Sequence, residues 1–487
     1  MEQGQDGLGA RVAAAGDSIV GDTRLARFGH WMQQNRQAIR IIQWFVVLTY
    51  GFFVVTPAFI PPPVATASLW NSVAVFAKFA FWGIWWPSVL LSIVIFGRVW
   101  CGLLCPEGTL TEFASKHGRG WAIPRWMRWE GSPFFAFIAT ALCGQMLSMH
   151  DYSKATLLVL GGSTCSAILI GYLYGREKRV WCRFLCPVKG VFSLLARLAP
   201  LHYRVDEAAW RKSYVSATPS RRDSAVIPVN CAPLVPLRNM KGNAECHMCS
   251  RCSGHRNAIK LSWRSPSNDV VVHGEQQGTR WETVLILYGL FGIAIGAFHW
   301  SASPWFAQWQ TMLTRWLLAH HILWPLATNA PWFVLTHDPD GGRVFSWLHG
   351  GLGIAYMIAT ALAYGTSLLA VLALGARVLG SWRASRLHHL TQAMIPLAGT
   401  GMFLGASMTT LSMLHVGHME WGWVGNSRFL MLLLANVWSA WLAFGVVRRH
   451  STKPLSQAGA LLLFAIALAI ADSAWWLLFW HWPSAAG

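Results

Sequence analysis

The sequence predicts an all-α polytopic membrane protein with about nine transmembrane helices and one small cytoplasmic insert. Three observations predict this fold class. The 487 residues are 54% hydrophobic and only 12% charged. Charge-free apolar runs long enough to cross a bilayer as helix recur along the chain. One polar stretch that carries four cysteines interrupts them, and it has no spanning segment of its own.

The apolar runs divide the chain into four regions. We expect spans at residues 41–60, 81–97, 133–149, 155–175, 283–299, 350–376, 391–414, 429–447 and 458–480. A basic, cytoplasmic N-terminus occupies residues 1–40. Residues 41–190 form two membrane hairpins, residues 191–281 the insert, and residues 282–487 a C-terminal five-helix membrane region. The 30 Trp are typical of interfacial aromatic belts.

The distribution of basic residues predicts the orientation. The net charge is +19, from 39 Lys and Arg against 20 Asp and Glu. If the N-terminus is cytoplasmic and the nine spans alternate, the outer side holds only Lys78, Lys154, Arg315, Arg343 and Arg428. This is the positive-inside pattern of a multi-pass protein in the bacterial inner (cytoplasmic) membrane, with the insert cytoplasmic. We therefore attribute the positive net charge to membrane topology and expect no nucleic-acid partner.

A nine-residue phrase occurs twice, once at the inner end of each hairpin. It reads Arg-Val-Trp-Cys-Gly-Leu-Leu-Cys-Pro from residue 98 and Arg-Val-Trp-Cys-Arg-Phe-Leu-Cys-Pro from residue 179, with seven of nine positions identical. Cys101 and Cys105, and likewise Cys182 and Cys186, are then one turn apart on one helix face. In a reducing cytosol, metal binding or thiol cycling is favoured over structural disulfides. Four thiolates meeting in one S4 site would suit an iron–sulfur cluster or zinc, and two cycling dithiols are the alternative.

The insert carries the second cysteine signal. Cys246, Cys249 and Cys252 have the x2-x2 spacing that wraps a loop around a cubane cluster. The usual fourth position holds Arg256, so we assign Cys231 as the fourth ligand of a [4Fe-4S] cluster in a ferredoxin-like iron–sulfur insert. Zinc is the rival occupant, because it also accepts four thiolates.

With these motifs, residues of about 40–260 resemble the NapH/NosR/CcoG group of membrane-bound 4Fe-4S polyferredoxins. The resemblance implies cytoplasmic [4Fe-4S] clusters and electron transfer between the quinol pool and reductases, or support of metalloenzyme maturation. It implies that Cys101, Cys105, Cys182 and Cys186 are functional cysteines at the membrane face. The C-terminal spans lie outside it. The chain departs from the group, whose members typically have two complete four-cysteine runs, because it has a single incomplete run.

The C-terminal region raises a further possibility on the outer side. Met408, His415 and His418 lie close together near the end of one predicted span, and His299 and His349 are predicted at similar depth. Thioether and imidazole groups suit copper, and paired histidines suit haem b. A quinol-site role and plain interfacial packing are the other interpretations.

The sequence thus predicts a membrane-bound iron–sulfur electron-transfer protein. Its expected partners are the lipid bilayer, quinol or quinone, and a redox partner protein. Quinol dehydrogenase activity is left open. Two alternatives remain: a protein that handles copper or another metal for metalloenzyme maturation, and a structural subunit whose cluster only staples the insert. No phosphate-binding or dinucleotide-binding glycine motif is found.

Overall fold

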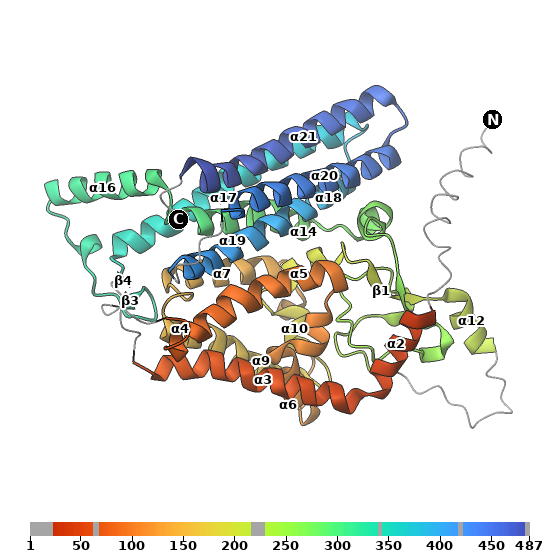
Figure 1. Cartoon of the computed structure of the whole chain (residues 1–487). Helices are drawn as coiled ribbons and strands as arrows, with labels where there is room; N and C mark the ends of the chain where they lie inside the picture. The colour runs from red at the N-terminus through yellow and green to blue at the C-terminus, as the bar shows by residue number, and fades with distance from the viewer. Residues whose placement is uncertain (1–22, 62–67, 216–228, 339–342, 417–421, 483–487) are drawn as a thin grey trace. The chain divides into compact units, whose positions relative to one another are not determined.

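The computed structural model describes residues 23–61, 68–215, 229–338, 343–416 and 422–482. Within these ranges, eight helical segments are long and apolar enough to cross a membrane. They are Arg36–Phe59, Val73–Phe96, Ser153–Tyr174, Arg280–His299, Trp347–Val378, Ile395–Leu414, Val424–His450 and Pro454–His481. The prediction of an all-α, multi-pass membrane protein is confirmed (Figure 1).

The ninth predicted span, 133–149, differs from the other eight. It forms helix α7, Ser132–Met146, of 15 residues. At 1.5 Å per residue this helix is about 22 Å long, short of the roughly 30 Å of a bilayer core. The chain leaves the helix at Leu147, and Ser148 follows with a left-handed φ of 48°. The predicted count of nine spans is therefore not confirmed.

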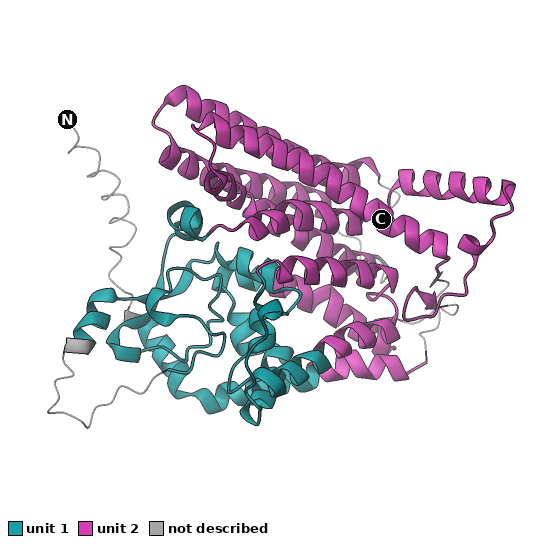
Figure 2. Ribbon diagram, turned by 180° about the vertical axis from the view of Figure 1, so that it is seen from behind, with its two compact units in different colours: residues 1–49, 91–129, 164–277 teal, residues 50–90, 130–163, 278–487 magenta. Residues whose placement is uncertain are grey.

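The chain forms two compact units, which Figure 2 colours separately. Unit 1 comprises residues 1–49, 91–129 and 164–277, and unit 2 comprises residues 50–90, 130–163 and 278–487. Helices α3 (Arg36–Phe59), α5 (Trp86–Phe96) and α9 (Gly162–Tyr174) contribute residues to both. All eight cysteines of the two motifs fall in unit 1.

Unit 1 surrounds the two cysteine motifs with short elements. Besides parts of α3, α5 and α9, it contains α2 (Thr23–Gln34), η2 (Trp100–Leu104), α6 (Pro106–Lys116), η3 (Arg125–Arg128), α10 (Val180–Phe184), α11 (Lys189–Ala196), β1 (Leu201–Val205), α12 (Glu207–Val215), η6 (Leu237–Asn239), η7 (His255–Asn257), β2 (Ile259–Trp263), η8 (Asn268–Val272) and α13 (Gly274–Gln277).

The insert is built on one antiparallel strand pair. Strands β1 and β2 pair in register from Leu201 opposite Trp263 to Val205 opposite Ile259. Tyr203, Ile259 and Leu261 turn inward from the two strands and pack with Met248 in one buried cluster. The strand pair therefore supports the cysteine loop that begins at Cys246. That the insert is ferredoxin-like stays a prediction.

Unit 2 is a helix bundle. It contains α4 (Val73–Lys78), η1 (Phe79–Trp85), α7, α8 (Ser153–Thr156), η4 (Leu157–Gly161), α14 (Arg280–Val284), η9 (Leu285–Ala294), α15 (Ile295–His299), α16 (Pro304–Ala319), η10 (Trp324–Leu326), β3 (His337–Asp338), β4 (Arg343–Val344), α17 (Trp347–Val378), α18 (Ala384–Gln392), α19 (Ile395–Val416), α20 (Val424–His450), α21 (Pro454–Trp476) and η11 (Leu477–His481).

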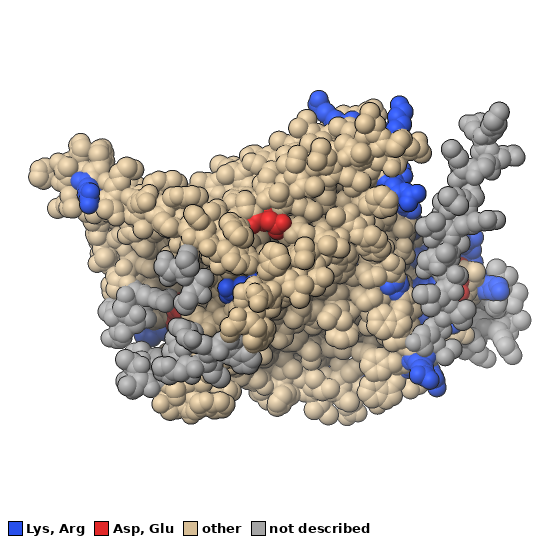
Figure 3. All heavy atoms as spheres, turned by 45° about the horizontal axis from the view of Figure 1, so that its top comes forward, with Lys and Arg blue, Asp and Glu red and all other residues tan. Residues whose placement is uncertain are grey.

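Small residues let the helices of unit 2 approach closely. A Cβ added to Gly292 of η9 would lie 2.7 Å from the Ala361 Cα of α17. Such close approach is how helices pack where the surrounding lipid is as apolar as the side chains. Outward-facing apolar side chains remain exposed, such as Leu434 and Val437 of α20, each 59% exposed. Figure 3 shows the broad uncharged surface that results, as expected for helices in contact with lipid.

Candidate iron–sulfur site

The four cysteines assigned from the insert line one cavity. Cys231, Cys246, Cys249 and Cys252, the second cysteine set, face it together with Tyr203 and apolar side chains. Cys246 and Cys252 are buried, and the other two are partly buried. Sequence spacing placed three of these thiols together; the fold adds Cys231 from a separate segment. The structure thus brings the whole predicted ligand set around one enclosed space.

The loop between the first and last cysteines needs two unusual backbone conformations. Met248 has a φ of 53° and Ser250 a φ of 59°, both in the left-handed region. Non-glycine residues enter this region at a cost, so surrounding contacts must hold them. Met248 is packed in the buried cluster below the loop, and Ser250 Oγ accepts a hydrogen bond of 2.6 Å from Tyr203 Oη. These contacts fold the loop around the cavity.

Segments of the duplicated phrase hold Cys231 in place. Lys178 Nζ donates a hydrogen bond of 3.2 Å to the Cys231 carbonyl. The backbone N–H of Arg179 donates one of 2.8 Å to the carbonyl of Ala232. Lys178 and the first residue of the second copy thereby position the fourth thiol of the insert. No local sequence signal reports this link, because the partners lie more than fifty residues apart.

The electrostatics of the second cysteine set favour a positively charged occupant. Burial, together with the neighbouring thiols Cys249 and Cys231, raises the pKa of Cys246 to about 12. Burial and the same neighbours raise the pKa of Cys252 well above its usual value. Four thiolates can share this cavity only if a metal group compensates their charge. The donor set therefore fits iron, which requires deprotonated thiols.

The spacing of the sulfur atoms argues against zinc. In neither motif, all of whose cysteines are described, do three sulfur atoms lie within 4.8 Å of one another. A tetrahedral zinc site with bonds of about 2.3 Å would need sulfur atoms only about 3.8 Å apart. A cubane cluster binds each thiolate to a different iron and so accepts a wider arrangement. The geometry suits the larger group.

The duplicated phrase differs from its predicted helical form. Cys101 lies in η2, but Cys105 has an extended backbone, with φ −75° and ψ 119°, and is the N-cap of α6. In the second copy, Cys182 lies in α10, and Cys186 follows the end of that helix. The prediction that each pair occupies one helix face is wrong. The residue before a proline is pushed out of the helical region, so Pro106 and Pro187 set the second cysteine of each pair outside the helix.

The two copies nevertheless converge. We call Cys101, Cys105, Cys182 and Cys186 the first cysteine set. Burial and the nearby thiols of the other copy, Cys105 and Cys101, raise the pKa of Cys182 well above its usual value. The same two thiols also raise the pKa of Cys186, after burial and Glu107. The thiols of the two copies thus lie close enough to interact electrostatically, and that they form one S4 site stays a prediction.

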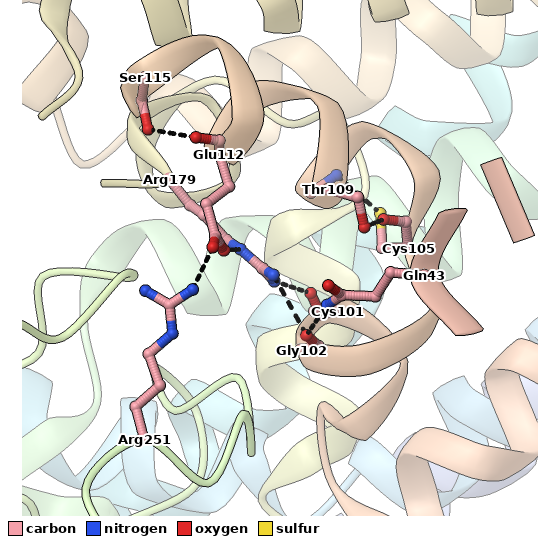
Figure 4. Close-up of polar contacts among 10 residues, drawn as sticks. Gln43, Cys101, Gly102, Cys105, Thr109, Glu112, Ser115, Arg179 and Arg251 are labelled. Atoms are coloured by element: carbon pink, nitrogen blue, oxygen red, sulfur yellow. Dashed lines mark hydrogen bonds and ion pairs between the residues drawn. The ribbon is translucent and has the colours of Figure 1, made fainter. Parts of the chain in front are cut away.

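A buried ion network connects the two cysteine sets (Figure 4). Arg179 Nε donates to Glu112 Oε2 at 2.9 Å, and its terminal nitrogens donate to the carbonyls of Cys101 and Gly102. Arg251, which lies between Cys249 and Cys252 in sequence, pairs with the other oxygen of Glu112. Burial would raise the pKa of Glu112, but the two arginines hold it below its usual range. Glu112 therefore carries its charge between the two sets.

Sequence reasoning did not find Glu112. It lies on α6, which begins directly after Cys105, and its carboxylate reaches Arg179 because α6 and the start of α10 are neighbours in unit 1. The sequence shows Glu112 only as an acidic residue in a segment rich in basic residues. That signal identifies a charge but not its partner.

The first cysteine set also touches the insert through its backbone. A Cβ added to Gly102 would lie 2.0 Å from the His247 carbonyl oxygen and 3.1 Å from the Cys249 nitrogen. Only glycine allows this approach. The second copy of the phrase has Arg183 at the matching position, where it pairs with Glu245. The one non-conservative difference between the copies thus marks where the insert docks.

A polar cavity in unit 1 runs beside both sets. Arg36, Arg40 and Gln43 line it from the first turns of α3, and Gly102 and Cys249 line it from the two sets. Gln43 Nε2 donates a hydrogen bond of 3.2 Å to the Gly102 carbonyl. The cavity is therefore bounded by a helix that is long enough to cross a membrane and by both candidate cofactor sites.

The histidines of unit 2 that were predicted on the outer side have aromatic surroundings where the structure describes their side chains. The ring of His299 lies 5.2 Å from that of Trp482, whereas the ring of His349 packs against Phe345 at 4.4 Å. Met408 is partly buried in α19. His418 lies outside the described residues, as does the side chain of His415. A copper, haem b or quinol role for these residues stays a prediction.

Comparison with known proteins bears directly on the repeat. The family model described as "4Fe-4S binding domain" matches residues 79–124 and 159–205. Each matched segment begins within one membrane-crossing helix, runs past its C-terminal end and contains one Cys-x3-Cys-Pro phrase. The chain is also similar to the "Putative electron transport protein YccM" of Escherichia coli (strain K12), at 23% identity over 191 residues. That alignment covers 34% of this chain and 50% of YccM, so the chain spans about half the length of this curated relative. No solved structure matches the chain significantly.

These matches confirm the predicted cofactor, a 4Fe-4S cluster. They also shift the emphasis between the two sets. The matched segments contain the first cysteine set and end before Cys231. Sequence reasoning placed the cluster in the insert and left the repeat open between metal binding and thiol cycling.

Proposed function

We propose that the chain passes single electrons from quinol in the membrane to a redox partner protein, through one 4Fe-4S centre at each cysteine set. The observation that carries this proposal is the convergence of eight cysteines into two neighbouring sets of four within unit 1. Each cluster, when bound, takes up and releases one electron at a time. The protein supplies the ligands, the positions and the surrounding charge.

Fixed cations support the reduced forms of both centres. Arg179 is buried beside the first cysteine set, and Cys182 and Cys249 both interact with its charge. Arg251 extends from the second set to the same carboxylate. Positive charge and N–H donors near a cluster raise its reduction potential. Because Glu112 partly neutralises both arginines, the reduction potential should be raised less than two uncompensated arginines would raise it.

The polar cavity beside α3 supports a donor that arrives from the membrane. Gln43 and Arg40 lie in the first turns of a membrane-crossing helix, and the cavity they line reaches Gly102 of the first cysteine set. A quinol headgroup that is held by amide and guanidinium donors there would be next to the first centre. On this proposal the chain acts as a quinol dehydrogenase subunit, and the resemblance to the NapH/NosR/CcoG group supports that choice.

The distribution of Lys and Arg supports the orientation. On the positive-inside rule, both cysteine sets face the cytoplasm of a bacterial inner membrane. Electrons would then leave from the cytoplasmic side to the partner protein.

Metal content with EPR tests the two-centre proposal. Anaerobically purified protein should contain about eight irons, four for each centre, and two EPR signals after reduction. Cys101→Ser and Cys231→Ser should each remove one signal and lower the iron content by about half. Cys143→Ser is the matched control, because Cys143 lies exposed on α7 and belongs to unit 2, whereas both sets belong to unit 1. Zinc without iron, or about four irons unaffected by Cys101→Ser, would contradict the proposal.

Quinol oxidation is tested separately. In proteoliposomes that contain a reduced quinol, the wild-type centres should become reduced. Gln43→Leu removes an amide donor from the cavity and should slow that reduction, whereas dithionite should still reduce both centres fully. Equal rates for Gln43→Leu and wild type would remove the cavity from the electron path.

A further inference from the structure

His247 is a buried histidine whose two ring nitrogens have no hydrogen-bond partner in the protein. Its side chain is 1% exposed, and neither Nδ1 nor Nε2 is paired. A buried polar group without a partner costs about 1–3 kcal/mol. The cysteine loop therefore tolerates an unpaired imidazole between two cluster ligands, Cys246 and Cys249. A leucine of similar size would avoid this cost, so the imidazole calls for a partner that the protein itself does not provide.

His247 lies between the two cysteine sets, with its backbone against the first. Its carbonyl oxygen lies against Gly102, beside Cys101. The charged groups that act on its ring are Arg98, Arg179 and Arg183, which belong to the two copies of the duplicated phrase, and Lys189, which closely follows the second copy. His247 thus lines the cavity of the second set, while the charged groups around its ring come from the segments that carry the first set.

The chemistry of these neighbours limits which group can accept a hydrogen bond from the His247 ring. Arginine and lysine side chains carry only donors, so none of the four can accept a hydrogen bond from the imidazole N–H. Thiolate and inorganic sulfur atoms of an iron–sulfur cluster are acceptors, and N–H donors to them are a recognised way to tune its potential. The first centre is the acceptor that the flanking segments would hold nearby.

We propose that His247 donates an N–H hydrogen bond to the 4Fe-4S centre held by Cys101, Cys105, Cys182 and Cys186, and so links the two centres directly. The inference rests on the proposed function, because it requires a cluster at each set. His247 acts as a positioning residue: its hydrogen bond stabilises the reduced first centre, and its peptide bond to Cys246 joins it to a ligand of the second centre.

The test uses the full-length chain with both centres loaded. His247→Leu should lower the equilibrium constant for reduction of the first centre at least tenfold, which lowers its reduction potential by about 59 mV for a one-electron couple. His247→Gln keeps an N–H donor and should restore part of that shift. With ¹⁵N-labelled histidine, pulsed EPR of the first centre should show a histidine nitrogen coupling that His247→Leu abolishes. His255→Leu is the matched control, since His255 follows Cys252 closely but packs against Trp210.

The result can be separated from a failure of the proposed function. Iron content and both EPR signals are measured first, and Cys101→Ser identifies which signal belongs to the first centre. If both centres are present in His247→Leu, but the potential of the first is unchanged and no histidine nitrogen couples to it, the proposal is overturned. A coupling to the second centre alone would also overturn it.

Discussion

Replacing Glu112 with glutamine should loosen the link between the two cysteine sets. The carboxylate of Glu112 compensates Arg179, whose side chain is 2% exposed, and Arg251, whose side chain is 25% exposed. Glu112→Gln keeps the shape but removes the carboxylate charge, so the Arg179 charge is left with neutral acceptors such as the carbonyls of Cys101 and Gly102. Removing one partner of a buried ion pair costs about 3–5 kcal/mol.

We expect about 3 kcal/mol, the low end of that range, because Glu112 is partly exposed and glutamine can still accept a hydrogen bond. This corresponds to a roughly 150-fold larger open fraction of the site. Iron release to a chelator under anaerobic conditions measures that fraction, provided that opening and closing are faster than chelation. Glu112→Gln should therefore release iron on the order of 100-fold faster than wild type.

The matched control is the same substitution in an exposed ion pair. Glu207 pairs with Arg211 one turn along α12, with side chains 66% and 74% exposed. Such a pair contributes about 0.5 kcal/mol or less, so Glu207→Gln should change the release rate by less than about threefold. A Glu112→Gln rate within threefold of wild type would refute the assignment of Glu112 as the compensating charge.

Three further perturbations test the same unit. Gly102→Ala places a Cβ 2.0 Å from the His247 carbonyl oxygen and should reduce iron content, whereas Gly162→Ala, with no atom within 4 Å, should not; equal iron in both would contradict the close approach. Arg98→Met removes the donor to the Ala244 carbonyl at 2.9 Å and should destabilise the insert by about 2 kcal/mol, seen as faster limited proteolysis after residue 229. Burial and Arg264 lower the pKa of His202 to about 4, below the unfolded value near 6.5, so the unfolded state binds the extra proton between these values. Stability should thus be full above pH 6.5 and fall by about 3 kcal/mol as pH drops to 4; if His202→Gln leaves the acid dependence of proteolysis unchanged, His202 is not its source.

The membrane architecture was predictable because apolar run length reports directly on a span. The eight long spans lie where the runs of apolar residues placed them. The prediction of a span at 133–149 failed because composition does not show where a helix ends. The chain turns at Leu147, and α7 stops after Met146. The helix-face interpretation of the cysteine pairs failed for a local reason that was visible in the sequence, the proline after each second cysteine.

The site was predictable as residue types but not as an arrangement. Spacing alone identified Cys246, Cys249 and Cys252, since a cubane-binding loop is a local structure. The position of Cys231 depends on hydrogen bonds from Lys178 and Arg179, which are distant in sequence. Glu112 and His247 carry no motif at all. Their roles follow from which groups surround them in the folded unit, and a linear pattern does not contain that information.

The single glycine in the first copy of the duplicated phrase has a consequence for how the two halves can evolve. A duplicated hairpin starts as two interchangeable parts, either of which can meet a neighbour. Gly102 gives one half a bare backbone surface against the insert, and Arg183 closes that surface on the other half. On the proposed function, only the first copy then offers electrons a close backbone contact with the insert. Mutations at these two positions should therefore have different effects, and neither copy of the phrase can replace the other.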